Sequence, residues 1–72
     1  MTKLFIDIVG ATEKRLDFSG RMFSCPEEAG EAAQLVSLDL GVTENSPWVG
    51  AEVQVMDEAG RCLFSYRVGQ LQ

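Results

Sequence analysis

The sequence predicts an α+β domain in which four strands and one helix follow one another in the order ββαββ. Apolar and polar residues alternate in segments near both ends of the chain, which is typical of strands with one buried face. Between these segments, apolar residues recur at spacings of three and four, which is typical of an amphipathic helix. Seventy-two residues leave no room for a second core, so we expect residues 1–72 to form a single domain.

Two strands are predicted in the N-terminal part of the chain. Residues 4–9 alternate so that one face of the first strand is strongly apolar. After a turn at residues 10–13, a second alternating segment covers residues 15–19 and is interrupted by Gly20. The side chains that these two strands are expected to contribute to the core are Leu4, Ile6, Ile8, Leu16 and Phe18.

One helix is predicted over about residues 26–40. Ser24 and Glu27 have the spacing of a capping box, and Pro26 is tolerated in the first turn. Gly41 is expected to supply a left-handed C-terminal cap, followed by a loop at residues 43–47. The apolar stripe expected to face the sheet consists of Ala29, Ala32, Ala33, Val36 and Leu40, widened on one flank by Leu35.

The last third of the chain predicts a β-hairpin with a definite register. Two alternating sets of side chains lie opposite each other only if the turn between them holds an even number of residues. A four-residue loop at residues 57–60 meets this condition and places Gly60 where a left-handed backbone is needed. The two sets are Val49, Ala51, Val53 and Val55 on the first strand, and Cys62, Phe64, Tyr66 and Val68 on the second.

The connection through the helix favours one strand order. A right-handed crossover makes the third strand parallel to the second, with the first strand between them. We therefore expect a four-stranded antiparallel sheet of order 2-1-3-4 with the helix packed on one face. Trp48 is expected to cover one end of the core; the alternative is that it is an exposed anchor for an interaction.

Charge and cysteine content limit the class of partner. Eleven acidic and six basic side chains give a net charge of −5, and the cations are too scattered along the sequence to identify a phosphate-binding cluster. No apolar run approaches the length of a membrane span, and the N-terminal run contains Asp7, unlike a signal peptide. With no histidine in the chain, Cys25 and Cys62 are expected to be reduced, largely buried thiols of a cytoplasmic protein. We expect no nucleic-acid partner, no membrane partner and no cofactor.

The face of the sheet that the helix leaves uncovered is the first candidate site. Phe5, Met56 and Leu63 could form an apolar patch on it, of the kind that interfaces use. Polar neighbours keep open the alternative that this face is a wet surface. The predicted interaction surface consists of Phe5, Glu52, Gln54, Met56, Leu63 and Arg67.

Asp7 and Asp17 form the second candidate site. If Ile8 faces Leu16, the two carboxylates lie opposite each other on the uncovered face, where like charges destabilise a sheet. Such a pair could hold a divalent cation, or raise one carboxyl pKa for acid–base chemistry. The alternatives are that a neighbouring cation neutralises the pair, or that Asp17 caps a turn toward Gly20.

Several short motifs span most of the chain without including a catalytic residue. They are residues 3–8, Asp17 with Gly20, Ala29 with Ala33, and residues 53–61. Together they resemble a family of small domains of unknown function that is known mainly from alphaproteobacteria. Members of that family often have an aromatic pair where Phe5 and Ile6 stand, and Glu where Ser19 stands. The resemblance implies a compact ββαββ-type domain and brings no established activity.

The chain is predicted not to be an enzyme, because no phosphate-binding glycine loop and no nucleophile with a base in range can be identified. The favoured function is a protein-interaction or structural module that could self-associate through the uncovered sheet face or an edge strand. One alternative is a small ligand-binding or divalent-metal-binding domain that uses Asp7 and Asp17. Another is an antitoxin-like partner protein, since the helix start at residues 26–29 is similar to that of antitoxin-type domains.

Overall fold

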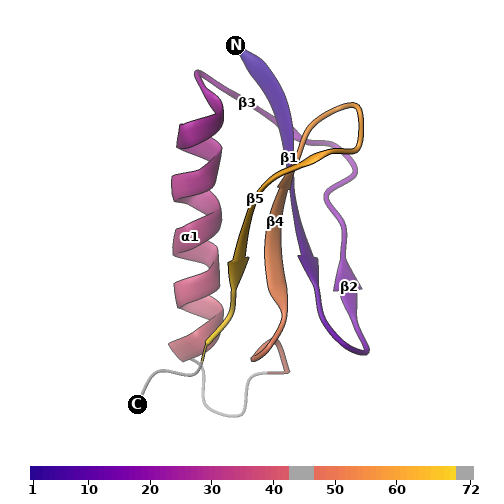
Figure 1. Cartoon of the computed structure of the whole chain (residues 1–72), viewed down its shortest axis with the longest axis vertical. Coiled ribbons are helices and arrows are strands. Elements are labelled where there is room, and N and C mark those ends of the chain that lie inside the picture. Colours follow the sequence, from indigo (N-terminus) through magenta and orange to yellow (C-terminus); the bar gives the residue numbers. More distant parts are fainter. Residues whose placement is uncertain (43–46, 70–72) are drawn as a thin grey trace.

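The computed structural model describes residues 1–42 and 47–69, and it shows one helix packed on an antiparallel sheet (Figure 1). The α+β class expected from the sequence is confirmed. Most of the loop expected at residues 43–47 lies outside the described residues. The elements in chain order are β1 (Thr2–Val9), β2 (Lys14–Arg15), β3 (Arg21–Phe23), α1 (Pro26–Val42), β4 (Glu52–Met56) and β5 (Cys62–Arg67).

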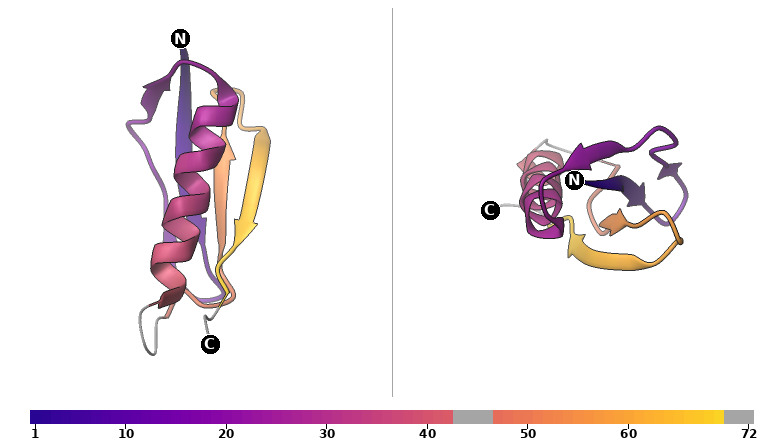
Figure 2. Two further views of the ribbon diagram at one scale, coloured as in Figure 1. Left: turned by 90° about the vertical axis from the view of Figure 1, so that its left-hand side faces the viewer. Right: turned by 90° about the horizontal axis from the view of Figure 1, so that it is seen from above.

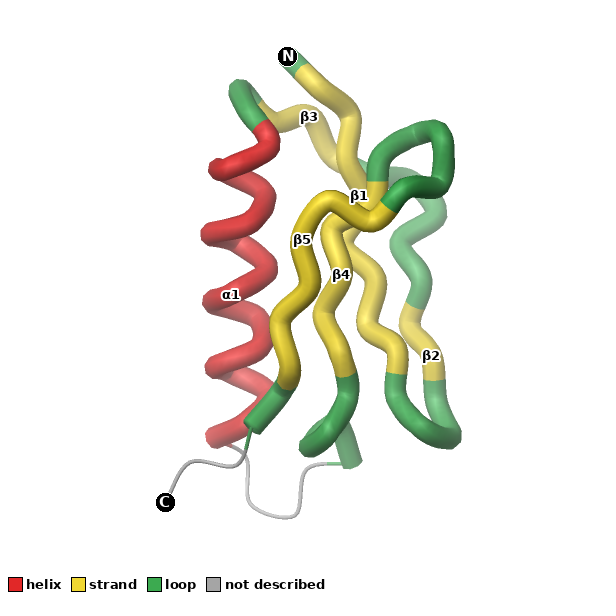
Figure 3. Tube along the Cα trace, in the orientation of Figure 1, coloured by secondary structure: helices red, strands yellow, loops and turns green. Residues whose placement is uncertain are grey.

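The sheet has the order β2-β1-β4-β5, with β3 also paired to β1, and every pair is antiparallel. The four predicted strands therefore lie beside one another as expected, and the short strand β3 is an addition. Figure 3 shows β1 as the longest strand, with β4 on one side and the interrupted β2–β3 edge on the other.

The second predicted strand is broken by an irregular segment, which we call the β2–β3 loop (residues 16–20). Arg15 pairs with Ile8, whereas Arg21 pairs with Leu4. The edge takes six residues to run from Arg15 to Arg21, whereas β1 covers the same distance in four, from Ile8 to Leu4. The edge therefore has two more residues than can pair with β1, and this segment leaves the sheet. Leu16 and Phe18 are exposed, so the prediction that they enter the core is wrong.

The register of β2 explains this error. The turn at residues 10–13 forms as predicted, with the Gly10 N–H donating to the Glu13 carbonyl at 2.7 Å. It aligns Arg15, rather than Leu16, with Ile8. Because side chains alternate between the two faces, this shift of one residue turns the whole segment over.

Helix α1 covers the predicted range, and its cap differs by one residue (Figure 2). Glu28, rather than Glu27, reaches back to Ser24: its Oε2 accepts from the Ser24 hydroxyl at 2.8 Å and its Oε1 from the Ser24 N–H at 3.4 Å. Gly41 is not a left-handed cap, because it lies inside the helix. A Cβ atom at Gly41 would overlap the carbonyl oxygen of Gly69, so the glycine permits close contact with the end of the hairpin.

The core lies between α1 and the facing side of the sheet. Small residues bring the helix close to β5, because the backbone of Gly30 faces the Tyr66 hydroxyl and the Phe64 ring. Trp48 packs half-buried against the core, as expected for a cover at one end. The buried apolar residues are Leu4, Ile8, Phe23, Ala29, Ala33, Ala51, Val53, Val55 and Val68.

The β4–β5 hairpin keeps the predicted faces, but its predicted register is wrong by two residues. A four-residue loop would pair Val55 with Cys62, whereas Val55 pairs with Phe64 and Val53 with Tyr66. Gly60 has a φ of +84° in the turn. Its two ends differ from the prediction. A bulge at Val55/Met56 places Cys62 opposite Met56, where its side chain is exposed.

Three further residues that were expected to be buried are exposed. Val49 lies in the turn before β4, outside the strand. Cys25 lies just before the first residue of α1 and is a free, exposed thiol like Cys62. Leu35 lies on the outer face of α1 and does not widen the buried stripe. The predicted core is therefore correct for β1, the inner helix face and the middle of the hairpin.

Candidate interaction site

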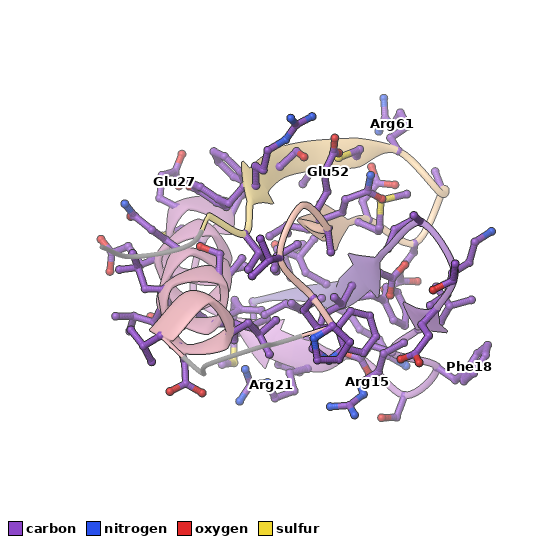
Figure 4. All side chains as sticks on the ribbon, turned by 90° about the horizontal axis from the view of Figure 1, so that it is seen from below. Arg15, Phe18, Arg21, Glu27, Glu52 and Arg61 are labelled. Atoms are coloured by element: carbon purple, nitrogen blue, oxygen red, sulfur yellow. The ribbon has the colours of Figure 1, made fainter. Side chains whose placement is uncertain are left out.

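The β2–β3 loop displays an aromatic side chain to solvent. Phe18 is 85% exposed, more than any other large apolar residue among those described except the terminal Met1. In Figure 4 its ring projects away from the body of the molecule, on the side opposite the helix. Leu16 in the same loop and Met22 in the adjoining β3 are also exposed. These three exposed apolar residues follow one another along the same edge of the sheet, and we call them the loop patch.

Asp17 fixes the shape of the β2–β3 loop. Its Oδ1 accepts from the Gly20 N–H at 3.0 Å and from the Ser19 hydroxyl at 3.4 Å. Its Oδ2 accepts from the Ile6 N–H of β1 at 3.3 Å. The carboxylate therefore closes a turn inside the loop and also attaches that turn to the sheet. This turn toward Gly20 is one of the two alternatives expected for Asp17.

Asp7 adds a further attachment. Its Oδ1 accepts from the Asp17 N–H at 2.9 Å, so the structure brings the two predicted carboxylates together. They do not meet as opposite residues of a ladder, because Ile8 faces Arg15. Each accepts backbone N–H groups, and these donors offset the like-charge repulsion that prompted the metal hypothesis.

The ionisation of Asp17 follows from these contacts. Partial burial raises the pKa of its carboxyl group, but the N–H donors of Gly20 and Ile6, with Ser19, outweigh burial and lower the pKa below its ordinary value. Asp17 is therefore ionised at neutral pH, which does not suit a general acid. Within the described residues, no three or more Asp, Glu or Cys side chains gather as a metal site. Cation binding by Asp7 and Asp17 stays a prediction.

The β2–β3 loop also covers part of the predicted interaction surface. Gly20 has a φ of +71°, and a Cβ atom there would lie only 2.8 Å from Cε1 of Phe5. The loop backbone thus passes directly over the Phe5 ring, which is half-buried. Phe5 supports the loop from below and is not freely available to a partner.

The rest of the uncovered sheet face is organised around Glu52. Its Oε2 accepts from the Ser65 hydroxyl at 3.0 Å and from Nε2 of Gln54 at 3.4 Å, and its Oε1 lies 3.9 Å from Nη2 of Arg67. These polar side chains satisfy one another at a surface open to water. Met56 is half-buried and Leu63 is 39% exposed, so the apolar area beside them is small. The use of this face as an interface stays a prediction.

The cations of the β2–β3 edge have no carboxylate partner among the residues that the structure describes. Among the described residues, Lys14, Arg15 and Arg21 make no ion pair. Two of them instead lie over aromatic rings. The Arg15 guanidinium is 5.7 Å from the centre of the Trp48 ring, and that of Arg21 is 5.4 Å from the centre of the Phe23 ring. Arg15 and Arg21 pair with the buried residues Ile8 and Leu4, so these two cations lie on the helix side of the edge and not beside Phe18.

A second exposed apolar patch lies on the outer face of α1. Leu35, Leu38 and Val42 are 67%, 49% and 59% exposed. Their spacing of three and four places them on one face of the helix, which we call the helix patch. The sequence reasoning missed this patch because it assigned Leu35 to the buried stripe. Leu38 and Val42 follow Leu35 at helical spacing, a signal that was visible in the sequence.

Neither an enclosed ligand site nor a membrane span is present in the part of the chain that the structure describes. Residues 1–42 and 47–69 form no pocket. No helix within them is long and apolar enough to cross a bilayer.

Comparison of the chain with known protein families, with characterised proteins and with solved structures found no match.

Proposed function

We propose that this chain is a non-enzymatic protein-interaction module whose recognition element is the β2–β3 loop. The observation that carries the proposal is the exposure of Phe18 on a loop held by four hydrogen bonds to the carboxylates of Asp7 and Asp17. Single exposed apolar residues are common on protein surfaces. Phe18 is distinguished by its apolar neighbours and by the hydrogen bonds that fix its backbone.

A fixed loop favours recognition for a thermodynamic reason. Ordering a mobile segment at an interface costs free energy, and a loop already held in shape avoids much of that cost. Aromatic and arginine side chains are also frequent among the residues that dominate binding energy. Phe18 is an aromatic side chain of this kind, and it projects from the side of the molecule opposite the helix (Figure 4).

The other functions expected from the sequence have less support. A ligand or cation at Asp7 and Asp17 would have to compete with the backbone N–H groups that these carboxylates already accept. An antitoxin-like role is one form of the proposed interaction, but no described contact favours a toxin as the partner. A cytoplasmic location is part of the proposal, because Cys25 and Cys62 are exposed and unpaired, which suits a compartment that keeps thiols reduced. Membership of the alphaproteobacterial family also remains a proposal.

Affinity capture from native lysate, with Phe18→Ser and Leu63→Ser compared against the wild-type chain, tests the proposal. Both residues are exposed, but Leu63 lies on β5, away from the loop. We expect Phe18→Ser to reduce a captured protein at least about tenfold, as the loss of a binding residue worth about 1.4 kcal/mol would, and Leu63→Ser to leave it unchanged. Loss with Leu63→Ser alone would assign recognition to the sheet face. Equal capture by all three chains would refute the proposal.

A further inference from the structure

We propose that the free edge of β5 pairs antiparallel with β5 of a second copy of this chain, so that the two sheets join into one. This edge is the opposite end of the sheet from the β2–β3 loop, so the inference goes beyond the proposed function and does not depend on it. It rests on the direction of the main-chain groups of β5, on two half-buried aromatic rings beside them, and on the charge of the strand.

The hydrogen bonds at the end of the hairpin determine which main-chain groups of β5 point outward. Val68 donates its N–H to the Ala51 carbonyl at 2.8 Å, and its own carbonyl accepts from the Gly50 N–H at 2.8 Å. Both groups of Val68 therefore point toward β4. Because main-chain groups alternate in direction along a strand, those of Ser65 and Arg67 point away from β4. β5 is the last strand of the sheet in the described part of the chain, so these groups lie at its open edge.

Two aromatic side chains beside this edge are incompletely covered. Phe64 and Tyr66 pack against the core and are half-buried, whereas the residues that they pair with, Val55 and Val53 of β4, are fully buried. The two strands differ in their neighbours, because β4 lies between β1 and β5, and β5 is at the end of the described sheet. In the left view of Figure 2, β5 (yellow) is the outermost strand, and α1 lies over the face of the sheet without closing that edge. A further strand would supply both cover for the rings and partners for the main-chain groups.

The sequence of β5 suits pairing with itself. Two antiparallel copies centred on Tyr66 would place Ser65 opposite the second copy's Arg67, so that every outward N–H and C=O group of these two residues finds a partner. The two Tyr66 rings would then face each other, and aromatic pairs across strands are favourable. Arg67 is the only charged residue of β5, so no like charges lie opposite each other. Such a contact is isologous and closes at two copies.

The other edge of the sheet offers no equivalent site. There β2 has two residues and β3 has three, and the β2–β3 loop separates them. A second copy could therefore not pair along a continuous strand at that edge. An extended segment of another protein is the alternative occupant of the β5 edge, and it would leave the chain by itself monomeric.

Sedimentation velocity and amide hydrogen exchange, each measured over a dilution series, test the inference. A pair of short strands is at the weak end of specific association, with a dissociation constant on the order of 100 µM. We expect the mass to rise from the monomer value of 7.9 kDa to that of a dimer, and no further, as the concentration increases to about 1 mM. Over the same range the amides of Ser65 and Arg67 should become protected from exchange, and those of the β2–β3 loop should not change.

Ser65→Pro, with Ser65→Ala as its matched control, tests the position of the contact. Proline removes the outward N–H and is tolerated at a strand edge, whereas alanine keeps this N–H. Both variants lose the hydroxyl that donates to Glu52, so their difference reports the edge alone. We expect Ser65→Pro to weaken dimerisation at least about tenfold and Ser65→Ala to leave it nearly unchanged.

Ser65→Lys is a second variant that does not depend on how well the strand accepts proline. It places a cation beside Glu52 of its own chain, which suits the fold, and opposite the second copy's Arg67, which disfavours the dimer. Circular dichroism confirms that each variant is folded. Dimerisation that is equal in the wild-type chain, Ser65→Pro and Ser65→Lys, or protection that rises only outside β5, would overturn the inference. A wild-type chain that is monomeric at about 1 mM would also overturn it, and would leave the proposed function intact because capture through Phe18 concerns the opposite edge.

Discussion

Replacing Asp17 tests whether its carboxylate stabilises the β2–β3 loop. Asp17→Ala removes the acceptor for two backbone N–H groups, those of Gly20 at 3.0 Å and Ile6 at 3.3 Å, and keeps the N–H that Asp7 accepts. Each such bond contributes about 0.5–1.5 kcal/mol. Because the site is half-buried and partly screened by water, we take the lower part of the range. The expected loss in free energy of unfolding is about 1–2 kcal/mol, and Asp17→Asn, which keeps one acceptor oxygen, should lose about half of this.

Thermal and urea unfolding measure the effect. In a domain of this size the loss corresponds to a decrease in Tm of roughly 5–12 °C. Glu13→Gln is the matched control, since Glu13 is exposed and its side chain makes no hydrogen bond or ion pair within the described residues. A change for Asp17→Ala no larger than that of the control would refute the reasoning.

The pH dependence of the difference in unfolding free energy between the wild-type chain and Asp17→Ala gives an independent test. The folded-state pKa of Asp17 is lower than the value of about 3.9 expected in the unfolded chain. The ionised carboxylate therefore stabilises the fold above about pH 4, and this contribution is lost as pH falls through the folded-state pKa. The stability gap between the wild-type chain and Asp17→Ala should narrow as the pH is lowered from 7 toward 3. A gap that stays constant over this range would show that the charge of Asp17 is not its cause.

Three further substitutions have definite expected signs. Gly20→Ala should destabilise by about 1–3 kcal/mol in urea unfolding, because the φ of +71° disfavours a side chain and the added Cβ meets the Phe5 ring. Gly41→Ala should lower the Tm although alanine favours helix, since its Cβ overlaps the Gly69 carbonyl; Gly69→Ala, which has open space, is the control. Asp39→Lys should raise the stability to urea by about 0.3–1 kcal/mol through the helix dipole, because Asp39 lies in the last turns of α1. The opposite sign in any of the three would contradict its stated cause.

The fold was largely predictable because its strongest signals are redundant. In the hairpin, two alternating apolar sets both identify the face that meets the core, and Val53 and Val55 are buried as predicted. The register was not fixed by these signals, because a shift of two residues keeps every side chain on the same face. The helix was likewise marked by a start signal and a repeated spacing. The N-terminal cap of the helix was predicted from a single spacing, and there the prediction was wrong by one residue: Glu28, not Glu27, bonds to Ser24.

The candidate site was less predictable, because it depends on a register that alternation alone cannot fix. Residues 15–19 alternate equally well whether Leu16 or Arg15 faces Ile8, and apolar content favours Leu16. The structure selects Arg15, whose guanidinium lies over Trp48 at the end of the core. At a sheet edge, an arginine can therefore point toward the core side if its guanidinium stacks on an aromatic ring. The pattern of apolar residues in the sequence does not predict such an arrangement.

The two carboxylates that first suggested a metal site are better explained by the loop that they hold. If β2 continued as a regular strand in its observed register, Leu16 and Phe18 would point away from the helix and lie against the outer face of the sheet. The two extra residues lift this segment off the ladder instead, which leaves backbone N–H groups that need acceptors. Asp7 and Asp17 accept them, and Gly20 allows the chain to return over Phe5. Asp17 therefore holds the loop that displays Phe18, although its own side chain is not part of the exposed apolar surface. Loss of the Asp17 carboxylate should weaken binding through the loop without removing any apolar contact.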